Sequence, residues 1–260
     1  MRNEKYGTHG VQDFSLLISH FSLPRSGNVD EAATTEAQKA AAARHAAGLI
    51  EPGMTVGLGS GTTAELAVRE IGRRVAEGLR IIGVATSRRT ERLARDLGIP
   101  LVDLDAVDHL DLTIDGADEI ALDTFALIKG RGGALLREKI VAAASRREVI
   151  IADASKVVPR LGTRHPVPVE VVPFGWRHTG RALERLGARV APREVPGDFY
   201  VTDGGNFILD CAFGPLAAPA ALAAELKALA GVVEHGLFIG LAQVIVVAGE
   251  GGVKVMTNDE

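Results

Sequence analysis

Between residues 54 and 153, short apolar runs alternate with segments of helical periodicity, and this alternation restricts the fold more than any other feature. The predicted strands are MTVGLG, RIIGVAT, PLVDL, HLDLTID, FALIK and EVIIAD, and segments such as AELAVREIGRRV and SRRTERLARDLG are predicted helices. Buried strands that alternate with helices favour a parallel sheet covered on both faces. We therefore expect an α/β fold whose ligands bind beyond the carboxyl ends of the strands.

A different rhythm begins at about residue 166, after a proline-rich entry, and continues to about residue 236. The predicted order of elements there is close to β-α-β-β-α-β, which is typical of a ferredoxin-like split unit. The remaining segment, GLFIGLAQVIVVAGEGGVKVM, is predicted to return to the first domain as strands around a glycine-rich turn. Residues 1–30 are interpreted as a non-core N-terminal extension.

Charge and hydropathy exclude several kinds of partner. The formal net charge is −4, and the basic residues are interleaved with acids, so we expect no nucleic acid partner. No run reaches the roughly 18 apolar residues that a membrane span requires, so no membrane partner is expected. The N-terminal FSLLISHFSL lacks the flanks of a signal peptide, which predicts a cytoplasmic protein. A small-molecule partner is the remaining expectation.

The segment GLGSGTTAEL places a glycine-rich turn between a predicted strand and a predicted helix. The free N–H groups at such a helix start favour an anion. Gly59, Gly61 and Ala64 satisfy a loose dinucleotide pattern, but the next strand ends in VATSRRT and offers no acid for a ribose. The hydroxyl-rich SGTT suits a single phosphate, so phosphate binding is the preferred interpretation over a simple turn and helix cap.

Acidic and basic side chains follow several predicted strands. Asp115 and Asp118 come after HLDLTI, Lys129 ends FALIK, Glu138 begins a helix, and Lys156 follows EVIIAD. Taken alone, each is more often a cap or a solvated charge. Together at one sheet edge beside the SGTT loop, they predict proton abstraction next to a carbonyl of a phosphorylated small molecule. The seven histidines lack metal-ligand spacing, so no metal is expected.

Four segments in order, GLGSGTTA, DGADE, KGRGGALLREK and IADASK, resemble the signature segments of the ribose-5-phosphate isomerase A family. The likeness covers roughly residues 35–256. It implies a Rossmann-like parallel-sheet domain over residues 31–165 and 237–260, with a smaller ferredoxin-like lid over 166–236. It also implies interconversion of ribose 5-phosphate and ribulose 5-phosphate through an enediolate, without metal or other cofactor.

The resemblance implies a role for each matching residue. Glu138 matches the general base, Asp115 the acid that helps to open the furanose ring, and Asp118 with Lys129 the pair that binds hydroxyls and steadies charge on oxygen. The residues matched to substrate binding are Ser60, Gly61, Thr62, Thr63, Gly130, Gly132, Lys156 and, in the first helix, Lys39. Arg131 departs from the pattern, because many relatives carry glycine there.

Two other functions stay open from the residues alone. A sugar-phosphate-sensing regulatory domain would need a helix-turn-helix, and the segment before Met54 offers one clear helix. An NADP-dependent oxidoreductase would use Arg88 and Arg89 on a 2′-phosphate. Ala-rich helices and an exposed lid sheet predict a homodimer or homotetramer.

Overall fold

The computed structural model describes residues 29–258, so the predicted extension over residues 1–30 lies almost wholly outside the described residues. A six-stranded sheet in the order β15-β14-β6-β3-β1-β2 forms the centre of the larger part. Its strands are β1 (Thr55–Leu58), β2 (Ile82–Ala85), β3 (Leu112–Gly116), β6 (Glu148–Asp153), β14 (Val244–Gly249) and β15 (Gly252–Thr257). All neighbours pair in parallel except β14 and β15. The predicted α/β class with a central parallel sheet is confirmed.

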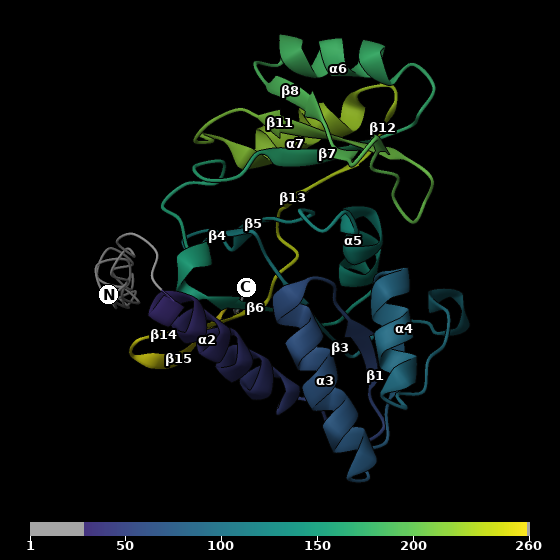
Figure 1. Cartoon of the computed structure of the whole chain (residues 1–260), viewed down its shortest axis with the longest axis vertical. Helices are drawn as coiled ribbons and strands as arrows, with labels where there is room; N and C mark the ends of the chain where they lie inside the picture. The colour runs from purple at the N-terminus through teal and green to yellow at the C-terminus, as the bar shows by residue number, and fades with distance from the viewer. Residues whose placement is uncertain (1–28, 259–260) are drawn as a thin grey trace, which may run out of the picture.

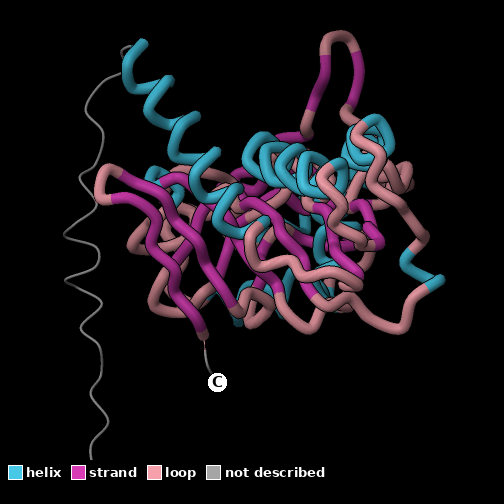
Figure 2. Tube along the Cα trace, turned by 90° about the horizontal axis from the view of Figure 1, so that it is seen from below, coloured by secondary structure: helices cyan, strands magenta, loops and turns pink. Residues whose placement is uncertain are grey.

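Helices cover both faces of this sheet, because its parallel strands are mostly apolar and buried. The helices are α2 (Val29–Ala47), α3 (Thr62–Ala76), α4 (Arg88–Asp96) and α5 (Leu135–Ala143). The first three share one core with β1, β3 and β6, while α5 lies on the other face (Figure 1). The hairpin β14–β15 runs beside α2 at one edge of the sheet (Figure 2). Within residues 29–258, no helix is long and apolar enough to cross a membrane.

The smaller part of the molecule is an antiparallel sheet in the order β12-β7-β11-β8, packed with two helices. Its elements are β7 (Val167–Val171), α6 (Trp176–Arg185), β8 (Arg189–Pro192), β11 (Phe207–Ala212), α7 (Pro219–Ala228) and β12 (Val232–His235). When the four strands are numbered along the chain, their order across the sheet is 4-1-3-2, which is the ferredoxin-like arrangement. A short hairpin, β9 (Glu194–Val195) and β10 (Asp198–Phe199), interrupts the path from β8 to β11. This part lies above the larger sheet in Figure 1 and is called the lid below.

Two predicted strands are corrected by the structure. FALIK forms β5 (Ala126–Ile128), but it pairs antiparallel with β4 (Glu119–Ala121) and β13 (Leu237–Phe238) in a separate small sheet. PLVDL forms only an isolated bridge between Leu101 and Gly83. The chain then turns into a short 3₁₀ helix, Leu104–Ala106, whose own N–H bonds replace ladder pairing.

Candidate active site

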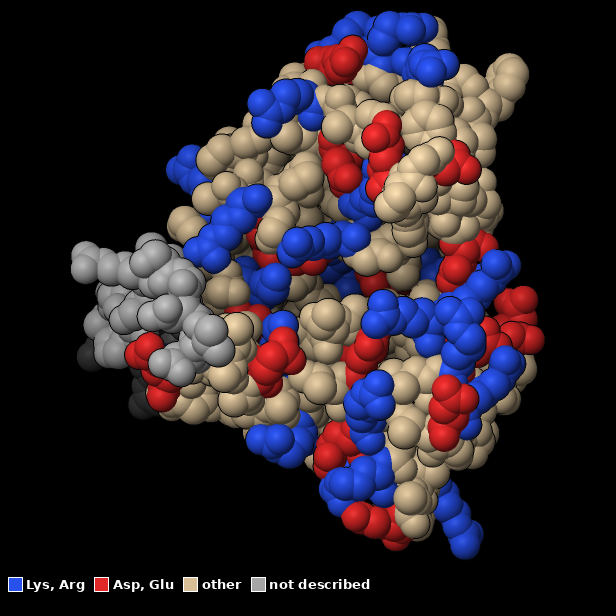
Figure 3. All heavy atoms as spheres, viewed as in Figure 1, with Lys and Arg blue, Asp and Glu red and all other residues tan. Residues whose placement is uncertain are grey.

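A pocket of about 400 Å³ lies beyond the carboxyl ends of β1 and β3, and its lining residues come from the larger part of the molecule. Charged side chains of both signs gather around the hollow between the larger part and the lid (Figure 3). Ten predicted site residues line it: Ser60, Gly61, Thr62, Thr63, Asp118, Lys129, Gly130, Gly132, Glu138 and Lys156. The structure therefore brings together residues that lie almost one hundred positions apart in the sequence.

The start of α3 forms one wall of the pocket. Gly61 has a φ of +92° and precedes the first helical residue, Thr62, without a side-chain cap. The N–H groups of this first turn are therefore available to an anion. The Ser60 hydroxyl bonds to a cluster of hydroxyls that the sequence analysis did not assign to the site. Its partners are Thr86 at 2.7 Å, Ser87 at 2.8 Å and Thr90 at 3.1 Å.

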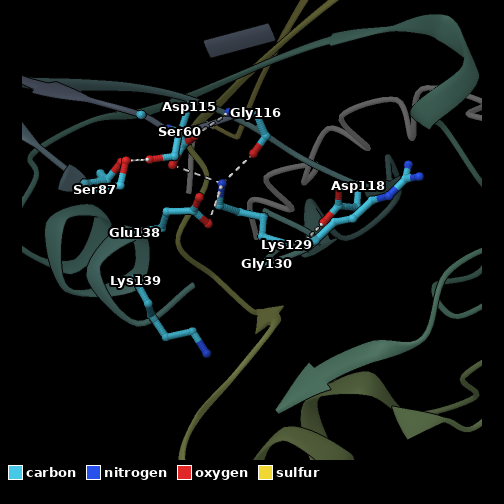
Figure 4. Close-up of polar contacts among 12 residues, drawn as sticks. Ser60, Ser87, Asp115, Gly116, Asp118, Lys129, Gly130, Glu138 and Lys139 are labelled. Carbon is cyan, nitrogen blue, oxygen red and sulfur yellow. Dashed lines mark hydrogen bonds and ion pairs between the residues drawn. The ribbon is translucent and has the colours of Figure 1, made fainter. Parts of the chain in front are cut away.

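A buried lysine joins two carboxyl groups on the floor of the site (Figure 4). The Lys129 ammonium lies 3.0 Å from Asp115 Oδ2 and 3.3 Å from Glu138 Oε2, and it also donates to the Gly116 carbonyl. Asp115 Oδ1 accepts the N–H of Ser60 at 3.0 Å, which ties the SGTT loop to this cluster. Asp115 itself is fully buried and is not part of the pocket wall.

Burial controls the protonation of these groups. It raises the pKa of Glu138 to about 8, helped by Asp115 and Asp118 and opposed by Lys129. Burial also raises the pKa of Asp115, although Lys129 works against it. Burial alone would lower the pKa of Lys129, but the surrounding carboxylates outweigh it and keep the pKa above its usual value. A base with a pKa near neutrality beside a permanent cation can exchange protons at physiological pH.

The glycine loop after Lys129 forms the opposite wall. Asp118 Oδ2 accepts the N–H of Arg131 at 2.9 Å, so the predicted substrate-binding aspartate also holds this loop. From the lid, Arg193 donates to the carbonyls of Gly130 at 2.8 Å and Arg131 at 3.0 Å. The backbone conformation of the loop therefore depends on a lid side chain.

Five residues that line the pocket were not predicted site residues: Glu65, Arg89, Gly116, Ala117 and Arg131. Two predicted residues, Asp115 and Lys39, do not line it. Arg89 and Glu65 line the pocket and pair with each other at 2.7 Å. The SRRT segment at the next strand end was the available signal for Arg89, which had been considered only for a nucleotide phosphate. Lys39 does not line the pocket and pairs with Glu36 at 2.7 Å, so its role in substrate binding stays a prediction. Within the described chain, no group of three or more His, Cys, Asp or Glu side chains is placed to hold a metal.

A parallel sheet with a buried carboxyl–lysine pair beside an open helix N-terminus is an arrangement typical of α/β enzymes that act on anionic substrates by acid–base chemistry. The sequence profile described as ribose 5-phosphate isomerase A (phosphoriboisomerase A) matches residues 82–252. The chain belongs to this family, as its signature segments predicted.

Individual relatives agree over nearly their whole length. The ribose-5-phosphate isomerase A of Gloeobacter violaceus is 58% identical over 84% of this chain and 95% of its own. That of Thermomicrobium roseum is 56% identical over 85% and 94%. A solved ribose 5-phosphate isomerase A from Methanocaldococcus jannaschii superposes with a TM-score of 0.82 and 38% identity, over 86% of this chain and 99% of that one. A D-ribose-5-phosphate isomerase in complex with phospho-erythronic acid gives a TM-score of 0.83 and 36% identity over the same shares.

Proposed function

We propose that this protein interconverts D-ribose 5-phosphate and D-ribulose 5-phosphate, with Glu138 as the general base. The observation that carries the proposal is the buried Glu138 carboxyl on the pocket wall, 3.3 Å from the Lys129 ammonium. Membership of the isomerase family supports the substrate, and a structural neighbour holds phospho-erythronic acid, a phosphorylated sugar acid. The reaction belongs to the non-oxidative pentose phosphate pathway.

The chemistry follows from a base and a cation at one place. The Glu138 carboxylate removes the proton from C2 of the open-chain aldose, and the electron pair moves onto the C1 oxygen to give an enediolate. Lys129 stabilises the charge that develops on oxygen, and Asp118 binds a hydroxyl. The proton of the C2 hydroxyl passes to the C1 oxygen, and Glu138 returns the proton it took from C2 to C1. The C2=O bond of the ketose forms in this step, so no oxidant or reductant is consumed.

The phosphate of the substrate binds at the wall formed by the start of α3 in this proposal. The open N–H groups of α3, the hydroxyls of Thr62 and Thr63 and the ammonium of Lys156 supply donors for its oxygens. Asp115 stays a predicted participant in ring opening. Its bonds to the Ser60 N–H and its contact with Lys129 support a further task, that of holding the loop and the lysine in register.

Substitution of the base tests the proposal. Glu138→Gln keeps the size of the side chain and removes its basicity, so we expect kcat to fall at least ~10²-fold with little change in KM. Glu91→Gln is the control, because Glu91 also lies in the first turn of a helix but outside this pocket. Ketose formation from ribose 5-phosphate is measured with and without EDTA. Normal turnover of Glu138→Gln, or an inactive wild-type protein, contradicts the proposal.

The proposed form of the protein is a cytoplasmic homodimer or homotetramer. Val253 and Val255 are 36% and 44% exposed on β15, the outer strand of the large sheet, and such an edge is suited to a second copy. Light scattering coupled to size-exclusion chromatography measures the mass directly. A monomeric mass at micromolar concentration contradicts this part of the proposal.

A further inference from the structure

The chain passes from the lid back to the catalytic part through a very short connection. Strand β12 ends at His235, β13 begins at Leu237, and only Gly236 lies between them. Gly236 donates its N–H to Pro168 O in the lid at 2.7 Å and accepts the N–H of Lys129 at 2.9 Å. A Cβ atom at position 236 would lie 2.2 Å from Lys129 O, so only glycine allows this approach. We call the segment from Glu234 to Phe238 the crossover.

Lys139 connects helix α5 to this crossover. Its ammonium bonds to Glu234 Oε1 at 2.8 Å, to His235 O at 2.6 Å and to Leu237 O at 2.9 Å. An ammonium has three N–H donors, so these three acceptors satisfy it completely. Its nitrogen also lies 4.8 Å from the centre of the Phe238 ring. Every one of these partners belongs to the crossover.

The neighbour of Lys139 on the same helix is Glu138, and Figure 4 shows their side chains leaving α5 in different directions. Glu138 reaches Lys129, whereas Lys139 reaches the crossover. The crossover in turn binds the backbone N–H of Lys129, and the Phe238 ring lies 5.4 Å from the Lys129 ammonium. The helix that carries Glu138 and the backbone of Lys129 therefore both bind the crossover.

From this arrangement we infer that Lys139 is a positioning residue, which holds α5 against the crossover so that Glu138 stays in contact with Lys129. The inference rests on the proposed role of Glu138 as the base. Misplacement of a reacting group by about 1 Å can lower the rate by up to ~10²-fold. Loss of the contacts that fix the helix carrying the base should therefore have a measurable effect on the rate.

A second lysine provides a matched control. Lys227, on lid helix α7, binds the other oxygen of the same carboxylate, Glu234 Oε2, at 2.8 Å, and also Val233 O at 2.7 Å. It does not touch α5 in any of these contacts. Lys139→Met and Lys227→Met therefore each remove one ammonium from Glu234, but only the first releases the helix that carries the base.

The experiment compares kcat, KM and the pH profile of kcat for the wild type and these two variants. The base must be ionised, so wild-type kcat rises with pH through about 8, the pKa of Glu138. For Lys139→Met we expect kcat to fall by about 10-fold with KM within twofold. The midpoint of the profile should move to higher pH, because Glu138 loses contact with Lys129, which lowers its pKa. Lys227→Met should keep the wild-type kcat and midpoint.

The other titrating groups of the crossover, Glu234 and His235, do not account for a shift in the midpoint of the kcat profile. Burial works to raise the pKa of Glu234, but Lys139 and Lys227 outweigh it and lower the value to about 2. Burial, with Lys139, lowers the pKa of His235 to about 4. Both groups therefore keep one charge state between pH 6 and 10, where the profile is measured. The titratable groups that interact with Glu138 are Lys129, Asp115 and Asp118, together with Glu148 on β6 and Tyr200 in the lid, and all five are retained in the variants.

Three outcomes overturn the inference: equal kcat and midpoint in Lys139→Met and Lys227→Met, a rise in KM at unchanged kcat, or a fall in kcat without a shift of the midpoint. If Lys139→Met does not fold, Glu234→Gln replaces it, and an unshifted midpoint there overturns the inference. An inactive wild type would instead contradict the proposed function. If the wild type is active and Glu138→Gln is impaired, the proposed function stands and the Lys139→Met result tests the inference by itself.

Discussion

Glu148 is a buried acid that the proposed reaction does not use. It lies at the start of β6, its side chain is almost inaccessible, and neither of its carboxyl oxygens has a hydrogen-bond partner within the described residues. Burial raises its pKa well above the usual value, and the charge of Asp115 adds to this, against the opposing effect of Lys129. Lys129 interacts with three buried carboxyl groups, those of Asp115, Glu138 and Glu148, so a proton on Glu148 reduces the negative charge around this lysine.

The raised pKa predicts how stability depends on pH. The folded state holds a proton on Glu148 that the unfolded state releases above pH ~4.5, so this group favours folding in acid and loses that contribution as pH rises. Glu148→Gln, which cannot ionise, should be more stable than the wild type at pH 8, and the gain should shrink toward pH 4. Thermal unfolding across this range measures the effect, with Glu225→Gln on the exposed face of α7 as the control. A pH-independent difference between Glu148→Gln and the wild type contradicts the prediction.

Single residues were predictable where a strand end fixes them. Asp115 lies at the end of β3, so its place beside the SGTT loop could be inferred from strand order. Lys129 reaches the same place although β5 lies in a separate small sheet, so the strand order from which its place was predicted was wrong. The hydroxyl cluster around Ser60 could not be predicted, because Thr86 and Thr90 come from a different strand end and helix, and Ser or Thr at a helix start is ordinarily read as a cap. The burial of Asp115 behind Lys129 was equally hidden, because strand alternation does not give depth.

Helix α3 illustrates how one element makes a binding wall. Gly61 and Gly53 share a φ of +92°, and an added Cβ would meet no atom within 4 Å at either position. Alanine at either position should therefore cost a similar ~1–2 kcal/mol of stability through backbone strain alone. Only Gly61→Ala should also weaken the site, because relief of the strain rotates the N–H groups of α3. We expect the inhibition constant of inorganic phosphate to rise several-fold for Gly61→Ala and to stay unchanged for Gly53→Ala. Equal constants would argue against phosphate binding at α3.

The type of each element, helix or strand, was more predictable than the neighbour with which a strand pairs. The long amphipathic helices and the strands of the parallel sheet follow from periodicity. The placement of β5 does not, because three apolar residues fit a parallel or an antiparallel neighbour equally well. Its true partners, β4 and β13, are themselves only three and two residues long, and β13 comes from the far end of the chain.

At the scale of the whole molecule, the lid contacts segments that form or adjoin the pocket wall. Asp203 accepts the N–H of Arg88 at 2.7 Å, so the lid docks on the start of α4. Tyr200 donates its hydroxyl proton to Gly132 O at 3.3 Å. These contacts were not predictable from the sequence, because side chains of loops and short strands meet the larger part only after both parts have folded.

Arg193 gives the most direct test of this coupling. Asp210 holds its guanidinium at 3.0 Å, and the same group donates to the carbonyls of Gly130 and Arg131 in the glycine loop. Arg193→Ala leaves these carbonyls without their donor and frees the loop that shapes the substrate site, so we expect kcat/KM to fall at least ~10-fold.

Arg189→Ala is the matched control, because Arg189 begins β8, the strand that directly precedes Arg193, and its side chain is exposed. Steady-state assays of both variants at equal folded concentration measure the difference. If Arg193→Ala retains wild-type kcat/KM, or loses no more than Arg189→Ala, the lid does not set the geometry of the loop. The Asp210→Asn variant separates the two contacts of Arg193, because it weakens the support of the guanidinium without removing the donors. An intermediate loss in Asp210→Asn is expected if the lid acts through the orientation of Arg193.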